Sequence, residues 1–235
     1  MADLAVPDDP NLIYRYVDGP GDSVPLSRPL CQGDVLADVE VPPFDSSPYV
    51  VVMTHPCTMR RGEQLRPYLL VAAVRLTGEA VDTLYRQNKR VMPLAGLPAG
   101  ACVAKFDEMA SVTTHDLWRK HRVACLDDYG IAVLQQRQIH YMTRYTVEVE
   151  KLHEVNAPVL MELELLEEWR ERAFANRSIA ECRRIEVEVD RTFERAFEQY
   201  RQQAREPARR SSIRRSMRAT LAAASSDQVN LAGAQ

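Results

Sequence analysis

Short apolar runs, separated by turns rich in glycine and proline, occupy the first half of the chain. Residues 35–41 alternate apolar and polar positions, and residues 49–54 and 68–76 are apolar runs. Shorter runs cover residues 12–17, 91–94, 101–106 and 110–113. Runs this short and this often interrupted predict the strands of a barrel or a rolled sheet.

The second half of the chain, after residue 116, has the spacing of helices. Asp127 and Asp128 are predicted caps for a helix that continues through Tyr145. The polar face of this helix, which we expect to be exposed to solvent, consists of Gln135, Gln136, Arg137, Gln138 and His140. Pro158 predicts a boundary before a second helix over residues 159–175.

A third helix is predicted to begin at Ile179, because Ser178 and Glu181 match the reciprocal capping box. Its apolar positions, three or four residues apart, are Cys182, Ile185, Val189, Phe193, Ala196 and Tyr200. Such a seam packs on another helix as an antiparallel hairpin, or docks on the barrel. The sequence leaves both arrangements open.

These patterns predict an α+β protein, in which a small β-barrel is followed by a C-terminal helical extension. The predicted domains are an irregular N-terminal arm over residues 1–29 and a barrel with a helix over residues 30–146. A helical hairpin over residues 158–205 and a basic, disordered tail over residues 206–235 follow.

The formal net charge of −3 hides an asymmetry along the chain. Residues 201–235 hold seven arginines and two acidic residues, a charge of +5, so residues 1–200 carry −8. A basic tail binds nucleic acid or an acidic partner by Coulomb attraction and counterion release. The alternative is a solvated terminus.

Several classes of protein are disfavoured by composition. The five cysteines are widely spaced, which predicts reduced thiols and no metal site. No run approaches the roughly 20 apolar residues of a membrane span, and the acidic N-terminus lacks a signal core, so we expect a cytoplasmic protein without membrane contact. Neither GxxxxGK[ST] nor GxGxxG occurs, and we predict no cofactor.

Four stretches follow one another in a characteristic order. They are Gly33-Asp34-Val35, the strand 47–52 introduced by Pro48, the strand 69–74, and residues 106–112 leading to Leu126-Asp127-Asp128. Together they resemble the MazF/PemK family of ribosome-independent toxin endoribonucleases, over residues 31–144. The resemblance implies a small SH3-like barrel of the PemK/MazF type and a homodimer. It also implies a toxin-antitoxin or phage-defence context, with an antitoxin or defence-complex subunit as protein partner.

The family cuts RNA with an arginine just before the proline of the second strand and a serine or threonine at the end of the third. By resemblance these positions fall on Ser47 and on Arg75 or Thr77. A serine lacks the planar, charged fork that an arginine presents to phosphate, so this alignment implies loss of the ordinary mechanism. A shifted alignment, through residues 62–67, makes Arg66 the family arginine.

The loop after the second strand holds the strongest candidate chemistry. His55 has the ordinary pKa range of a general base for a 2′-hydroxyl, and Arg60 or Arg61 would neutralise a phosphate, giving metal-independent RNA cleavage. In the structural alternative, His55 satisfies a backbone carbonyl and the arginines are solvated. Cys57 is not expected to act as a nucleophile with His55 as its base, on the assumption that the two side chains point to opposite faces of an extended chain. A third orienting group is also not evident.

Two further groups of residues have the composition of nucleic-acid-binding sites. The first combines an aromatic ring with positive charges and consists of Trp118, Arg119, Lys120 and Arg122, with His121 between them. The second lies in the tail and consists of Arg209, Arg210, Arg214 and Arg215. For both, the alternative is an ordinary solvated surface.

The leading hypothesis is therefore a MazF/PemK-like protein that binds RNA, DNA or a protein partner without catalysis. The alternatives are a metal-independent endoribonuclease toxin that uses His55 with Arg60, Arg61 or Arg66, and an assembly subunit that oligomerises through its C-terminal helices.

Overall fold

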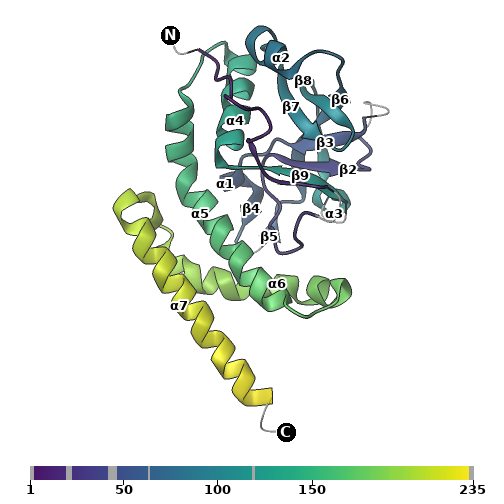
Figure 1. Cartoon of the computed structure of the whole chain (residues 1–235). Coiled ribbons are helices and arrows are strands. Elements are labelled where there is room, and N and C mark those ends of the chain that lie inside the picture. Colours follow the sequence, from purple (N-terminus) through teal and green to yellow (C-terminus); the bar gives the residue numbers. More distant parts are fainter. Residues whose placement is uncertain (1–2, 20–22, 42–46, 63, 118–119, 233–235) are drawn as a thin grey trace. The chain divides into compact units, whose positions relative to one another are not determined.

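The computed structural model describes residues 3–19, 23–41, 47–62, 64–117 and 120–232 (Figure 1). The chain divides into two compact units. The barrel unit comprises Met1–Pro25, Leu30–Arg61 and Leu65–Asn156. The helical unit comprises Leu26–Pro29, Gly62–Gln64 and Ala157–Gln235.

A seven-stranded antiparallel sheet forms a nearly closed barrel, so the protein belongs to the α+β class. Its order is β1-β9-β2-β3-β6-β8-β7. The strands are β1 (Tyr14–Val17), β2 (Asp34–Ala37), β3 (Tyr49–Val52), β6 (Tyr68–Leu76), β7 (Val91–Leu97), β8 (Gly100–Thr113) and β9 (Arg122–Leu126). Two shorter strands, β4 (Arg60–Arg61) and β5 (Gln64–Leu65), form a separate sheet.

The two longest predicted apolar runs form the centre of the barrel. β3 pairs with β6 in register from Tyr49 opposite Val74 to Val52 opposite Val71. Val50, Val52 and Val71 are fully buried in one hydrophobic cluster, and β2 covers the other edge of β3. β-Branched side chains suit this pleated, buried environment, which explains why these runs become strands.

Two predictions about the strands were wrong. Residues 101–106 and 110–113 belong to one strand, β8, whose pairing with β6 shifts register between Ala72 opposite Met109 and Val74 opposite Ala104. Glu108, in this irregular stretch, forms an ion pair with Arg75 of β6 at 2.7 Å. The helical half was expected to start after residue 116, but β9 pairs with both β1 and β2. Its short apolar run beside Asp127 gives no periodicity from which to separate strand from helix.

Both units of the chain contain helices. Within the barrel unit they are α1 (Pro56–Met59), α2 (Val81–Gln87), α3 (Thr114–Leu117) and α4 (Asp128–Thr143). The predicted cap of α4 is confirmed, since the Asp127 carboxylate accepts a hydrogen bond from the Gly130 N–H at 2.7 Å. α5 (Val149–Phe174) begins in the barrel unit and continues into the helical unit.

α4 joins the two edge strands of the barrel, β1 and β7. Near its start, a Cβ on Gly130 would lie 2.4 Å from the carbonyl oxygen of Ile13, so only glycine allows this approach to the chain that enters β1. Further along, the Arg137 guanidinium donates to the carbonyl oxygens of Val91 in β7 (3.1 Å), Asn88 (2.9 Å) and Tyr85. The helix therefore contacts the chain at both edges of the sheet.

The prediction that the polar face of α4 is exposed was wrong. Gln135, Gln136, Arg137 and His140 are all buried, and Arg137 has no exposed surface at all. Burial costs a charged group its hydration, which lowers the pKa of Arg137 to about 10. The three carbonyl acceptors and the face of the Tyr85 ring, 4.8 Å from the guanidinium carbon, offset that cost.

The helical unit contains the remainder of α5, followed by α6 (Ile179–Phe197) and α7 (Pro207–Ala232), with short 3-10 turns at Glu198–Tyr200 and Gln203–Arg205. The predicted start of α6 is confirmed: Ser178 and Glu181 form both hydrogen bonds of the capping box. Pro158 does not begin a helix as predicted but lies inside α5. The boundary between the two units nevertheless falls beside it, at Asn156 and Ala157.

Contacts along the helices set their directions. Arg170 of α5 pairs with Asp190 of α6, and the earlier Glu162 pairs with the later Arg201, so α5 and α6 run antiparallel. The α6 seam packs here on a helix. Phe193 stacks on Phe197 of the same helix, and it makes a T-shaped contact with Trp169 of α5, with the ring centroids 5.8 Å apart. Their cluster also contains Met161, Leu165, Leu166, Ala204, Ile213 and Met217.

The expectation of a disordered tail from residue 206 was wrong, because α7 is helical. Arg214 pairs with Glu164 at 2.8 Å, and Arg218 pairs with Glu164 (3.1 Å) and Glu168 (2.5 Å). From Arg214 to Arg218 of α7, and from Glu164 to Glu168 of α5, the paired residues advance by one turn in the same direction, so α7 runs parallel to α5. These arginines pair with the acidic face of α5. Among the helices that the structure describes, none combines the length and the apolarity that crossing a bilayer requires.

We expect Arg137→Met to lower the free energy of unfolding by about 2–4 kcal/mol, because it leaves three buried carbonyls without their donor. The free energy of unfolding of Arg137→Lys should lie between those of Arg137→Met and wild type, since an ammonium keeps the charge without the planar fork. Urea unfolding followed by circular dichroism measures both. A Met variant as stable as wild type would show that α4 does not depend on this contact.

We expect Asp190→Ala to cost the helical unit about 1.5–3 kcal/mol, because it removes the bidentate partner of a buried guanidinium and leaves Arg170 with Glu186 alone. Arg170 and Asp190 are 4% and 6% exposed, and their atoms approach to 2.6 Å. Glu188→Ala is the matched control, since its pair with Arg191 lies on the surface and is worth about 0.5 kcal/mol or less. Equal urea midpoints for the two variants would contradict this expectation.

Candidate functional site

The loop that follows β3 is anchored to β6 before it turns. The Met53 N–H donates to the Leu70 carbonyl at 2.8 Å, and the Thr54 hydroxyl accepts from the Leu70 N–H at 2.7 Å. His55 then caps α1, in which Pro56 occupies the first turn, where a missing N–H has no consequence. The sheet thus holds the backbone of His55 in place.

His55 and Cys57 lie side by side, contrary to the prediction that they face opposite ways. The imidazole Nδ1 is 2.9 Å from the thiol Sγ and accepts from the Cys57 backbone N–H at 3.3 Å. The prediction was wrong because residues two apart on an extended chain share one face. His55, the N-cap of α1, has an extended backbone, and its ring turns toward the N–H and the thiol of Cys57 in the first turn. The structure therefore brings a base and a nucleophile together.

A buried amide network supports the histidine from behind. The Asn156 side chain hydrogen-bonds His55, and it exchanges hydrogen bonds with Gln135 of α4, the shorter being 2.8 Å. Gln135 in turn donates to Gln32 at 2.7 Å, and Gln32 donates to the Met53 carbonyl at 2.8 Å. Burial lowers the pKa of His55, while the bond to Asn156 opposes that shift. The imidazole is therefore neutral at physiological pH.

The arginines of the loop differ in exposure. Arg60 is half-buried in β4, whereas Arg61 and Arg66 are exposed. The Arg66 N–H donates to the Met59 carbonyl at 2.8 Å, which fixes the chain just before β6. Among the described residues, neither Arg61 nor Arg66 forms an ion pair with a carboxylate.

Tyr68, the first residue of β6, is a functional candidate that sequence reasoning missed. Its side chain is 62% exposed, although it opens a strand whose following residues are largely buried. It was interpreted as the first apolar position of that strand. The available signal was its place two residues after Arg66, since exposed aromatics beside arginines are typical of nucleic-acid-binding surfaces.

The positions that the MazF/PemK resemblance marks for catalysis are engaged in the sheet. The Ser47 hydroxyl accepts from the Val74 N–H at 3.0 Å and lies 2.6 Å from the carbonyl oxygens of Tyr49 and Val74. Arg75 forms its ion pair with Glu108, and the Thr77 hydroxyl accepts from the Glu79 N–H at 3.1 Å. Ser47 therefore secures the pairing of β3 with β6.

The predicted nucleic-acid-binding group around residue 120 lies only partly within the described residues. Trp118 and Arg119 lie outside the described residues. Lys120 donates to the Asp38 carbonyl, and Arg122 pairs with the buried Asp34 at 3.2 Å. Both described cations thus have partners within the barrel unit.

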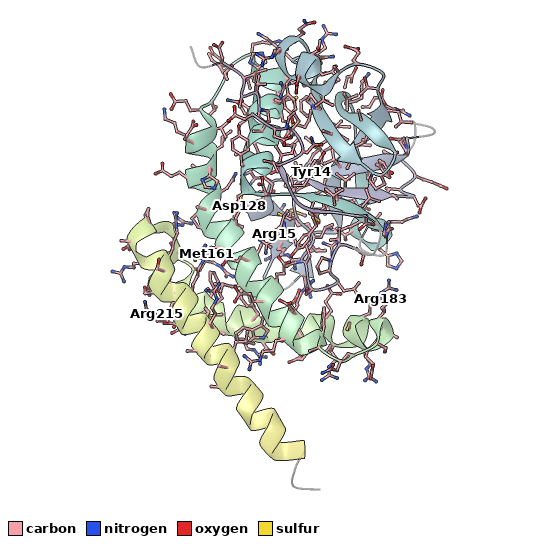
Figure 2. All side chains as sticks on the ribbon, viewed as in Figure 1. Tyr14, Arg15, Asp128, Met161, Arg183 and Arg215 are labelled. Atoms are coloured by element: carbon pink, nitrogen blue, oxygen red, sulfur yellow. The ribbon has the colours of Figure 1, made fainter. Side chains whose placement is uncertain are left out.

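In the tail, the predicted arginines lie on or beside the first turns of α7. Arg209 pairs with Glu206, Arg210 donates to the Ala204 carbonyl at 3.0 Å, and Arg214 pairs with Glu164. Arg215, labelled on α7 in Figure 2, is exposed. Two of these four charges, those of Arg209 and Arg214, are therefore balanced by carboxylates within the helical unit.

Comparison with known proteins identifies no relative: the sequence matches no family model and no curated protein. Among the described residues, no three histidine, cysteine or acidic side chains group closely enough to hold a metal ion. The site is therefore defined by its own residues. These are a His–Cys pair fixed by an amide network, and the neighbouring chain segment with two exposed arginines and an exposed tyrosine.

We expect the protein to lose stability as the pH falls below 6.5, the ordinary pKa of histidine, in part because of His55. Its folded pKa is lowered, so the unfolded chain binds the proton more tightly and acid favours unfolding. His55→Asn keeps a good N-cap and removes the titration. The shift in urea midpoint between pH 7.5 and pH 5.0 should be smaller in this variant, and an unchanged shift would contradict the assignment.

Proposed function

We propose that this protein binds single-stranded nucleic acid through Arg61, Arg66 and Tyr68, without cleaving it. We call these three side chains the arginine–tyrosine patch. The observation that carries the proposal is that two exposed arginines, without carboxylate partners among the described residues, accompany a tyrosine that is 62% exposed. Guanidinium groups bind phosphates, and a tyrosine ring stacks on any base.

The distribution of charge supports this choice of surface. The main body of the chain is acidic, and two arginines of α7, Arg214 and Arg218, are balanced by glutamates of α5. Residues 55–66 contain three arginines and one acidic residue. A local positive field on an otherwise acidic protein attracts phosphate to one place and repels it elsewhere.

The geometry around His55 argues for binding rather than cleavage. Cleavage at a 2′-hydroxyl needs a base whose acceptor nitrogen faces the substrate. The Nδ1 of His55 instead accepts from the Cys57 N–H and contacts its thiol. Ser47, where the family resemblance implies an arginine, is bonded to the strand backbone.

The wider setting of the proposal comes from the resemblance to MazF/PemK proteins. It comprises an SH3-like barrel of that type, a homodimer, a cytoplasmic location, and a toxin-antitoxin or phage-defence system with an antitoxin or defence-complex partner. The arginine–tyrosine patch would be the surface for which such a partner competes with nucleic acid.

Fluorescence anisotropy with a labelled single-stranded RNA of mixed sequence tests the proposal. We expect Arg61→Ala/Arg66→Ala to weaken binding and to reduce the slope of log Kd against log salt by about 1.4, since each phosphate contact to a single strand contributes about 0.7. Tyr68→Ala should weaken binding by roughly fivefold to a hundredfold, the effect of losing one stacked base.

Matched controls are Arg86→Ala and Tyr145→Ala, which remove exposed side chains of the same kinds elsewhere in the barrel unit. Both should bind like wild type. Equal losses in the controls, or no binding at low salt, would refute the proposal, and so would RNA cleavage that His55→Ala abolishes. The same titration with single-stranded DNA of the same sequence determines which nucleic acid binds more tightly.

A further inference from the structure

Cys57 differs from the other cysteines of the chain, all of which lie in the described residues. Cys31, Cys102, Cys125 and Cys182 are buried, whereas Cys57 is exposed. Burial raises the pKa of Cys102 to about 11, which keeps that thiol protonated. Cys57 alone combines access to solvent with a neighbouring imidazole, at 2.9 Å.

The hydrogen bonds around the ring determine where its proton lies. Nδ1 accepts from the Cys57 N–H, so the proton of the neutral imidazole is on Nε2. The thiol proton can then be donated to Nδ1, and the bond to Asn156 favours the ring that has gained a proton. Cys57, His55 and Asn156 thus have the relation of nucleophile, base and orienting group.

The surroundings of Cys57 restrict the kind of reaction. Acyl transfer needs backbone donors aimed at a developing oxyanion. The nearest donors are already used: the Cys57 N–H bonds the His55 ring, and the Thr58 N–H bonds the His55 carbonyl at 2.9 Å. A peroxide needs no such donors, because its leaving oxygen requires only a proton.

We propose that Cys57 is a modification site for hydrogen peroxide, with His55 as the base that activates its thiol and Asn156 as the positioning residue. The thiol proton moves to Nδ1 of His55 as the sulfur attacks one peroxide oxygen. An S–O bond forms and the O–O bond breaks. The departing hydroxide takes the proton back from His55, so thiol and peroxide become sulfenic acid and water. This inference does not depend on the proposed binding of nucleic acid.

The test treats the full-length protein with hydrogen peroxide in the presence of dimedone, which traps sulfenic acid, and follows the Cys57 peptide by mass spectrometry. We expect labelling at Cys57, none at the four buried cysteines over the same period, and none at position 57 in Cys57→Ser. His55→Asn should slow the reaction by about a hundredfold or more, since a positioned general base typically contributes roughly 10²–10⁴-fold.

His55→Asn separates activation from mere exposure, because asparagine retains the cap of α1 and leaves the thiol accessible. Circular dichroism confirms that the variant is folded. Treating the protein in denaturing urea, and following the same peptide, gives the rate of Cys57 oxidation without the folded contact to His55. We expect wild type and variant to react there at the same rate, slower than that of the folded wild type. A folded variant within about twofold of wild type, or unfolded wild type reacting as fast as folded, would overturn the proposal.

Discussion

A buried guanidinium determines how the barrel closes. Arg137 lies on α4, and its described hydrogen-bond partners are backbone carbonyls from α2, from the segment after it and from β7. Such a group is expensive to bury, so α4 has few positions in which both terminal nitrogens of the guanidinium find acceptors. With Gly130 in contact with the chain entering β1, the helix is fixed at both edges of the sheet.

The position of α4 then determines the geometry of the candidate site. Gln135, two residues before Arg137, holds Asn156 and Gln32, and Asn156 holds His55. The links among Gln32, Gln135 and Asn156 are hydrogen bonds between buried amides, where an unpaired amide costs about 1–3 kcal/mol. The orientation of the imidazole is therefore a consequence of how the barrel closes as well as of the loop that carries it.

Local signals allowed part of this structure to be predicted. The central strands follow from their apolar runs, and the starts of α4 and α6 follow from Asp127 and from Ser178 with Glu181, because a cap depends only on residues within one turn. The burial of Arg137 could not be predicted from the sequence, because its hydrogen-bond acceptors lie 46 to 52 positions away along the chain. Likewise, Arg214 and Arg218 of α7 were interpreted as solvated or bound to nucleic acid because their acidic partners lie 50 positions earlier, in α5.

The candidate site illustrates the same limit at short range, and it also constrains function. The two-residue spacing of His55 and Cys57 allows contact, because residues two apart on an extended chain share one face. The contact itself depends on His55 being the N-cap of α1, which turns its ring toward the Cys57 N–H. In this contact, Nδ1 of His55 accepts from the thiol of Cys57. Nδ1 is then not available to an RNA hydroxyl, because a hydrogen-bonded acceptor must be freed before it can act as a base for another group. The contact that makes Cys57 a candidate nucleophile thus counts against His55 as a nuclease base. The arginines and the tyrosine that follow in the chain remain open to phosphate and base, which is the division of roles proposed for this loop.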